Sequence, residues 1–179
     1  MKPVQIALAF GIAALAFASA APAFAALKVG DPAPDFQLQA ANNGKVSTFS
    51  LKAALKKGPV VVYFYPKAFT GGCSLEAHDF SEAMPKFKAK HVSVIGVSAD
   101  GIDILKKFST QTCAGKFPVA ADPDQVAGIQ YDAKMDGVIM DNRISYVIGK
   151  DGKIAFVHED GDAATHVPAL LDAVGASGK

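Results

Sequence analysis

The residue best suited to chemistry is Cys73, because the pattern around it places a thiol at the start of a helix. Residues 60–65 are apolar, β-branched and aromatic, which predicts a buried strand. A loop with one proline and two glycines follows, and the spacing turns helical from Gly71. Helix N-termini expose unpaired N–H groups and a partial positive charge, which stabilise a thiolate more than a thiol. The segment therefore predicts a reactive cysteine.

Further elements must position this thiol. Apolar runs at 92–98, 144–148 and 154–157 predict strands, with a tight turn between the last two. Helical spacing follows in three segments, about 102–114, 122–128 and 163–174. We expect an early hairpin around Asn43 and Gly44, one or two helical turns over 51–57, and a kink or interruption of the 71–90 helix at Pro85. The order of these strands and helices along the chain predicts an α/β fold with a central mixed β-sheet flanked by helices on both faces.

The N-terminus predicts export. Lys2 precedes an apolar run over 6–18, and Ala23-Phe24-Ala25 resembles a cleavage site, so residues 1–25 are predicted to be a signal peptide. An uncleaved membrane anchor is the alternative. Residues 26–179 then form one predicted domain, soluble because no second long apolar segment follows. The expected location is a Gram-negative periplasm.

Charge and cysteine content narrow the function classes. The chain has 18 basic and 17 acidic side chains, and loss of Lys2 leaves a net charge of zero. We therefore expect neither nucleic acid nor an anionic membrane surface as a partner. An oxidising compartment leaves two readings of Cys73 and Cys113 open: a structural disulfide or a redox-active pair.

Four segments in order resemble the peroxiredoxins, which have a thioredoxin-like fold. Pro66, Thr70 and Cys73 match the spacing P-x-x-x-T-x-x-C, with Glu76 three residues later. Residues 29–36 resemble the family's opening segment. Residues 94–100 resemble the family's strand that follows the cysteine motif, and residues 143–148 resemble the segment with the active-site arginine. Among subgroups, the peroxiredoxin Q (bacterioferritin comigratory protein) type is the most similar.

The resemblance implies a thiol-dependent peroxidase that needs no cofactor and whose nucleophile is Cys73. Arg143 would stabilise the thiolate and polarise the peroxide, while Thr70 would offer its hydroxyl to the sulfur or to a peroxide oxygen. Backbone N–H groups at the helix start would hold the peroxide oxygens. Pro66 would shield the sulfur from water, and Glu76 would orient Arg143. Plainer readings exist: a helix cap for Thr70, a first-turn acid for Glu76, a strand terminator for Pro66 and an exposed charge near Asp141 for Arg143.

The route by which the enzyme is recycled departs from the commonest pattern of the subgroup. Many members carry a second cysteine five residues after the first, where this chain has His78. Cys113 is the other thiol of the chain, so the resemblance implies an intramolecular disulfide between Cys73 and Cys113 during turnover. An external dithiol protein similar to thioredoxin would then reduce it. The alternative is a one-cysteine peroxidase in which Cys113 only fills the core.

Three other functions would use the same fold. A thiol–disulfide oxidoreductase usually has a second cysteine three residues after the first, where Glu76 stands, and a copper-delivery protein would want one at position 77, which is alanine. A redox-inert binding module with a static Cys73–Cys113 disulfide is a third reading. The four histidines lack metal-ligand spacing and are read as surface or supporting residues. A monomer is expected.

Overall fold

The computed structural model describes residues 27–176, so the predicted signal peptide lies outside the described residues. One seven-stranded sheet runs in the order β2-β1-β5-β4-β3-β6-β7. Its strands are β1 Gln37–Asn42, β2 Lys45–Ser50, β3 Val60–Phe64, β4 Ser93–Ser98, β5 Val119–Ala121, β6 Ile144–Ile148 and β7 Ile154–Glu159. The helices are α1 Leu51–Leu55, α2 Gly71–Ala89, α3 Ile102–Gln111, α4 Val126–Gln130 and α5 His166–Ala176, with a 3-10 turn η1 at Ala163–Thr165.

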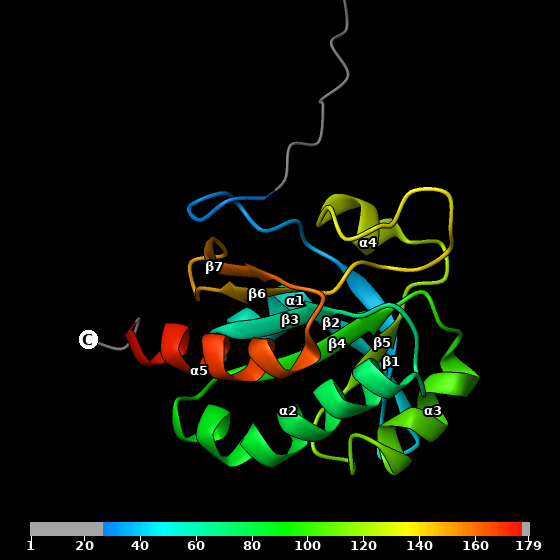
Figure 1. The fold of residues 1–179 in the computed structure, drawn as a ribbon. Helices are drawn as coiled ribbons and strands as arrows, with labels where there is room; N and C mark the ends of the chain where they lie inside the picture. The colour runs from blue at the N-terminus through cyan, green and yellow to red at the C-terminus, as the bar shows by residue number, and fades with distance from the viewer. Residues whose placement is uncertain (1–26, 177–179) are drawn as a thin grey trace, which may run out of the picture.

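The sheet is mixed, as predicted. Its centre is parallel, because β3 pairs with β4 and β4 with β5, whereas the flanking pairs are antiparallel. Helices α2, α3 and α5 cover one face, and α1 and α4 lie on the other (Figure 1). Strand β3 is fully buried: Val61 and Tyr63 face α2, while Val62 and Phe64 face α1 and α4. This explains its unbroken apolar run, which lacks the alternation of a half-exposed strand.

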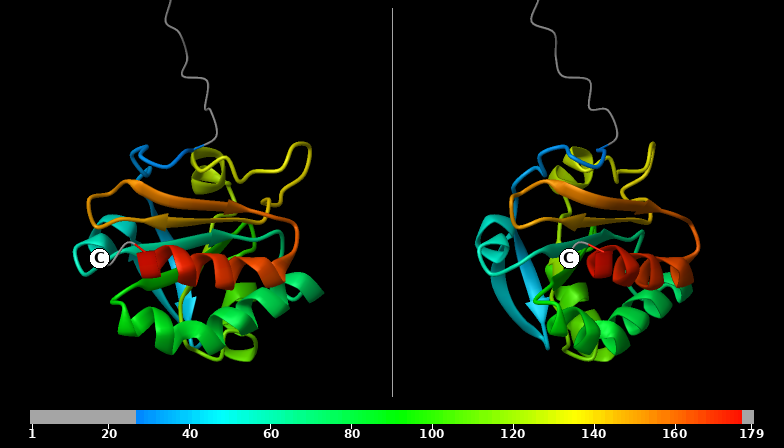
Figure 2. Two further views of the ribbon diagram at one scale, coloured as in Figure 1. Left: turned by 60° about the vertical axis from the view of Figure 1, so that its left-hand side comes forward. Right: turned by 90° about the vertical axis from the view of Figure 1, so that its left-hand side faces the viewer.

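Helices α2 and α5 lie side by side on their face of the sheet, as both views in Figure 2 show. Stacking of Phe80 on Tyr63, with ring centroids 4.2 Å apart, holds α2 against the centre of the sheet. The contact matters for the site, because α2 begins close to Cys73 and α5 begins at His166. Within the described residues, no helix is both long and apolar enough to span a membrane.

Several local predictions need correction. Helix α2 continues through Pro85 without interruption, because Met84 and Phe87 are anchored in the core on both sides of the lost hydrogen bond. The short strand β5 was not expected. The helix predicted from Asp122 begins later, at Val126, because the Asp122 carboxylate instead accepts from the backbone N–H groups at the start of α4. The hairpin of β1 and β2 is confirmed, with Asn43 and Gly44 both at positive φ.

Candidate active site

Cys73 lies in the first turn of α2, and its side chain is almost completely buried. The first hydrogen bond of the helix runs from the N–H of Ser74 to the carbonyl of Thr70, 2.8 Å away. The N–H groups of Gly71, Gly72 and Cys73 therefore lie ahead of the intrahelical ladder and point towards the N-terminal end. This gives the thiol the setting that the sequence predicted, with donors available to an anionic oxygen.

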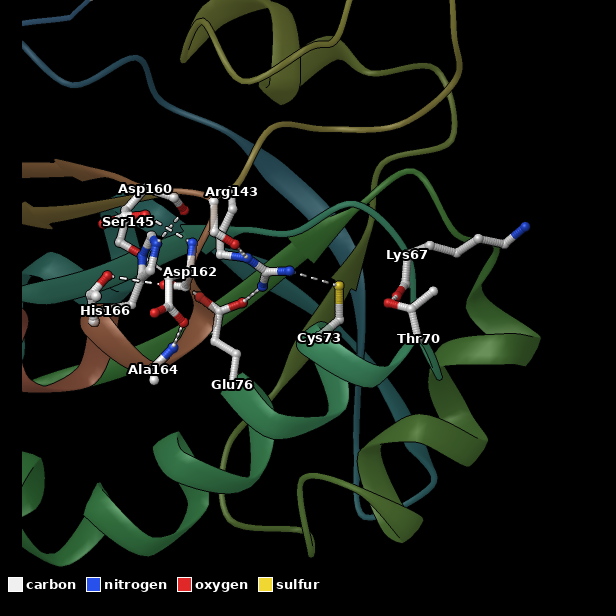
Figure 3. A network of polar contacts seen from close by, with 12 residues as sticks. Lys67, Thr70, Cys73, Glu76, Arg143, Ser145, Asp160, Asp162, Ala164 and His166 are labelled. Carbon is white, nitrogen blue, oxygen red and sulfur yellow. Dashed lines mark hydrogen bonds and ion pairs between the residues drawn. The ribbon is translucent and has the colours of Figure 1, made fainter.

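Arg143 reaches the sulfur from the segment just before β6, as Figure 3 shows. Its Nη2 lies 3.5 Å from Cys73 Sγ, its Nη1 donates to Glu76 Oε2, and its Nε donates to the Gly161 carbonyl at 3.3 Å. Three anchors therefore fix the planar guanidinium. The Arg143 side chain is only 9% exposed, so the reading of this residue as a free surface charge is wrong.

Gly72 leaves room for this arginine. A Cβ at this position would come within 3.1 Å of Arg143 Nη2, closer than ordinary packing allows. The glycine therefore permits the guanidinium to lie against the first turn of α2.

Glu76 lies one turn beyond Cys73 and is fully buried, outside the first helical turn. The plain reading as a first-turn surface acid therefore does not describe it. Burial raises the pKa of Glu76 to about 8, although the charge and hydrogen bond of Arg143 oppose this. Its second oxygen, Oε1, has no hydrogen-bond partner among the described residues and faces His166 Nδ1 at 3.7 Å.

The raised pKa of Glu76 has a consequence for stability. Between about pH 5 and 8 the folded protein keeps a proton that the unfolded chain has released, so the free energy of unfolding falls as the pH rises, by up to about 1.4 kcal/mol per pH unit. We expect Glu76→Gln to flatten this slope, measured by urea unfolding at several pH values. Glu82→Gln, at an exposed position of the same helix, is the control and keeps the wild-type slope. An equal slope in wild type and Glu76→Gln would contradict the prediction.

Thr70 is the N-cap residue of α2, but its side chain makes no capping hydrogen bond. Its hydroxyl instead donates to the Lys67 carbonyl at 2.9 Å. In this arrangement the hydroxyl hydrogen is not directed at the sulfur, while the oxygen keeps lone pairs that can accept from the O–H of a hydroperoxide. Thr70 lies on the other side of Cys73 from Arg143 (Figure 3).

The loop that precedes α2 is held by a carboxylate that the sequence reasoning did not single out. Asp100 Oδ2 accepts from the N–H of Ala68 at 2.7 Å and from the Ser98 hydroxyl at 3.0 Å. Pro66, half-buried in the same loop, lines a pocket of about 220 Å³ with Asp100 and Ile104. The position of Asp100 two residues after a buried strand was the available signal, since loop carboxylates commonly bind backbone N–H groups.

Cys113 lies two residues beyond α3 and is fully buried, and both cysteines are free thiols. Its carbonyl accepts from the Ser81 hydroxyl at 2.8 Å, which places it beside the middle of α2. Ser81 follows Cys73 by eight positions in α2, so the Cα atoms of Cys73 and Ser81 lie about 12 Å apart along the helix axis. Burial raises the pKa of Cys113 to about 12, so it is a neutral thiol at neutral pH.

Comparison with known proteins agrees with this geometry. The AhpC/TSA family pattern matches residues 29–157. The chain is 33% identical over 152 residues to Peroxiredoxin Bcp of Escherichia coli (strain K12), an alignment that covers 82% of this chain and 94% of that protein.

Two solved structures are similar in fold. One is peroxidoxin BcpB from Mycobacterium tuberculosis, with a TM-score of 0.75, 28% identity, and coverage of 84% of this chain and 97% of the other. The other is the bacterioferritin comigratory protein of Xanthomonas campestris, whose structure is reported with its alkyl peroxide reduction activity. Its TM-score is 0.73 and its identity 28%, and the match covers 86% of this chain and 98% of the other. The predicted resemblance and thioredoxin-like fold are confirmed: this chain belongs to the AhpC/TSA family, as a thiol-dependent peroxidase of the peroxiredoxin Q/Bcp type.

Proposed function

We propose that Cys73 reduces hydrogen peroxide and organic hydroperoxides, with Arg143 as the cation that serves the reaction. The observation that carries this assignment is the buried sulfur at the start of α2, with the Arg143 guanidinium 3.5 Å away. Few arrangements outside nucleophilic chemistry place a thiol against both a helix N-terminus and a buried cation.

The reaction balances with the Cys73 thiolate, the hydroperoxide and one proton from solvent. The Cys73 thiolate attacks one peroxide oxygen, a sulfur–oxygen bond forms and the O–O bond breaks. Cys73 is oxidised to a sulfenic acid, and the leaving oxygen takes a proton to become water or an alcohol. Negative charge grows on the leaving oxygen, so the Arg143 guanidinium and the N–H groups at the start of α2 stabilise the transition state. Thr70 accepts from the peroxide O–H, Glu76 orients Arg143, and Pro66 keeps bulk water from the sulfur.

Consumption of hydrogen peroxide and of tert-butyl hydroperoxide by the reduced protein, with dithiothreitol as reductant, tests this assignment. We expect consumption well above the rate of dithiothreitol alone with both substrates. Rates equal to that of the reductant alone would contradict the proposal.

Cys113 is the proposed resolving residue. Its thiol would condense with the sulfenic acid of Cys73 and release water, and a thioredoxin-like dithiol partner would reduce the resulting disulfide. The Cα atoms must come within about 7 Å, so the start of α2 or the end of α3 has to unwind. Phe69, at a φ of +65°, supports this proposal, because strain beside the first turn lowers the cost of opening it.

Intact-mass analysis after one equivalent of hydrogen peroxide tests the role of Cys113. We expect the loss of two hydrogens and a peptide pair linked through Cys73 and Cys113. In the Cys113→Ser variant the same treatment leaves a sulfenic acid at Cys73. A lasting sulfenic acid in the wild type, with Cys113 still reducible and alkylatable, would contradict this role and favour an external resolving thiol.

The setting of the enzyme is also a proposal. Residues 1–25 support export to the periplasm, where a dithiol protein would be the reductant. A monomer remains our expectation for the mature domain. Size-exclusion chromatography with light scattering checks it for residues 26–179.

A further inference from the structure

His166 is a buried titratable residue for which the proposed reaction has no use. It begins α5, it is fully buried, and it lies behind Glu76 as seen from Cys73. Figure 3 shows one continuous row of polar groups from the Cys73 sulfur through Arg143 and Glu76 to His166. A core of this size has apolar alternatives for such a position, so a buried imidazole against a buried carboxyl group calls for a physical reason.

The contacts of the imidazole fix where its proton can vary. Its Nε2 lies 2.9 Å from the carbonyl oxygen of Asp160, and a carbonyl only accepts, so Nε2 carries a hydrogen. Protonation can therefore change only at Nδ1, which lies 2.7 Å from Ser145 Oγ and 3.7 Å from Glu76 Oε1. The Ser145 hydroxyl can donate to a bare Nδ1 or accept from a protonated one. The site therefore accommodates both states.

The row of polar groups from Cys73 to His166 is electrically neutral only if it holds an additional proton. When Cys73 is a thiolate and Glu76 a carboxylate, two anions share the single cation of Arg143. An uncompensated charge in such a buried cluster is costly. Within residues 27–176, the ion pairs of Glu76 are with Arg143 and His166. One proton on either Glu76 or His166 makes the cluster neutral while Cys73 stays ionised.

We propose that Glu76 and His166 hold one proton between them, so that the full charge of Arg143 remains available to the Cys73 sulfur. His166 is then a positioning residue for peroxide reduction, acting through Glu76 and Arg143 without touching the substrate. The inference rests on the proposed function, because it concerns the reactivity of the Cys73 thiolate.

The surroundings agree with this assignment. Burial raises the pKa of Glu76 to about 8 and lowers the pKa of His166, so the carboxyl oxygen is the favoured place for the proton at neutral pH. Further groups act on the pair from each packed element: Asp79 on α2 and Arg143 before β6, His158 on β7, and Asp160 in the following loop. Asp79 favours the neutral acid, and Arg143 and His158 favour the neutral imidazole. Arg143 opposes the rise in the pKa of Glu76, and Asp160 opposes the fall in the pKa of His166, but neither reverses the shift.

The shared proton predicts that the rate of Cys73 oxidation depends on pH. Above about pH 8 the pair loses its proton, and the Glu76 carboxylate then competes with the thiolate for Arg143. The second-order rate constant for Cys73 oxidation should therefore fall above about pH 8. Glu76→Gln cannot ionise, so the descending limb should be absent from this variant.

The experiment measures the rate constant for oxidation of Cys73 by hydrogen peroxide between about pH 5 and 10, by competition with a haem peroxidase. We expect His166→Leu to lower the constant about tenfold at neutral pH, with partial rescue by His166→Asn, which keeps a hydrogen-bonding group near the Nδ1 position. His78→Asn is the control, because His78 is an exposed histidine on α2, and it should match the wild type. Circular dichroism checks that each variant is folded.

Nuclear magnetic resonance of the wild type keeps the inference testable even where a variant does not fold. The imidazole nitrogen shifts of His166 and the carboxyl carbon shift of Glu76 should report loss of one proton with a common midpoint. An ionised Glu76 beside a neutral His166 at neutral pH would overturn the inference, as would a descending limb that persists in Glu76→Gln or a folded His166→Leu with wild-type rates. A wild type that fails to consume peroxide at all would instead overturn the proposed function.

Discussion

Cys73→Ser should abolish peroxide consumption, lowering the rate by about a thousandfold or more. A serine hydroxyl at this position has the same neighbours, but it stays protonated at neutral pH and cannot attack the peroxide as the thiolate does. The buried site changes by a single atom, so folding should be preserved. The measurement is peroxide loss with dithiothreitol as reductant, for wild type and variant at equal concentration.

The matched control is Cys113→Ser, which removes the other thiol of the chain. It should keep the first oxidation of Cys73 at the wild-type rate, because Cys113 lies beside Ser81 and away from the reacting sulfur. If the Cys73→Ser protein consumed peroxide as fast as the wild type, Cys73 would not be the nucleophile. If only Cys113→Ser lost the first oxidation, the roles of the two thiols would be reversed.

Arg143→Met should be the next most damaging substitution. It keeps the length of the side chain but removes the donor 3.5 Å from Cys73 Sγ and the partner of Glu76. Loss of one preorganised donor to the developing charge lowers a rate constant by about a hundredfold to a thousandfold. The buried Glu76 carboxyl then lacks its donor, which should lower the free energy of unfolding by about 1–3 kcal/mol.

Arg143→Lys separates the charge of this residue from its geometry. A lysine ammonium cannot bind Glu76, the Gly161 carbonyl and the sulfur with one rigid plane, so we expect only part of the lost rate to return. Lys150→Met, which removes an exposed cation in the turn between β6 and β7, should leave both rate and stability unchanged. Full activity in Arg143→Met would contradict the role assigned to the guanidinium. Rapid-mixing measurement of Cys73 oxidation provides the rates.

The position of Cys73 at the start of a helix and the central strands could be predicted because their signals are local. The apolar run of β3, the change to helical spacing at Gly71 and the motif spacing all lie within one short segment. The approach of Arg143 to Cys73 joins positions 70 residues apart. That contact could be expected only from the family resemblance, since no local pattern reports which strands become neighbours.

What the sequence did not reveal depends on tertiary contacts. Strand β5 has three residues and follows Pro118, so its pattern is too short to be recognised. His166 is a single histidine at the start of α5, and its significance arises only when α5 packs beside α2 and brings the imidazole to Glu76. The predicted interruption at Pro85 does not occur, because local propensity gave way to packing against the sheet.

Cys73 is the nucleophile of this account, the residue whose sulfur accepts an oxygen atom from the peroxide. The most direct measurement uses the Cys113→Ser protein, treated with one equivalent of hydrogen peroxide in the presence of dimedone and analysed by peptide mass spectrometry. We predict a dimedone adduct on Cys73 that forms as fast as peroxide disappears, and its absence in Arg143→Met over the same interval. Disappearance of peroxide without any adduct or higher oxidation at Cys73 would contradict the account.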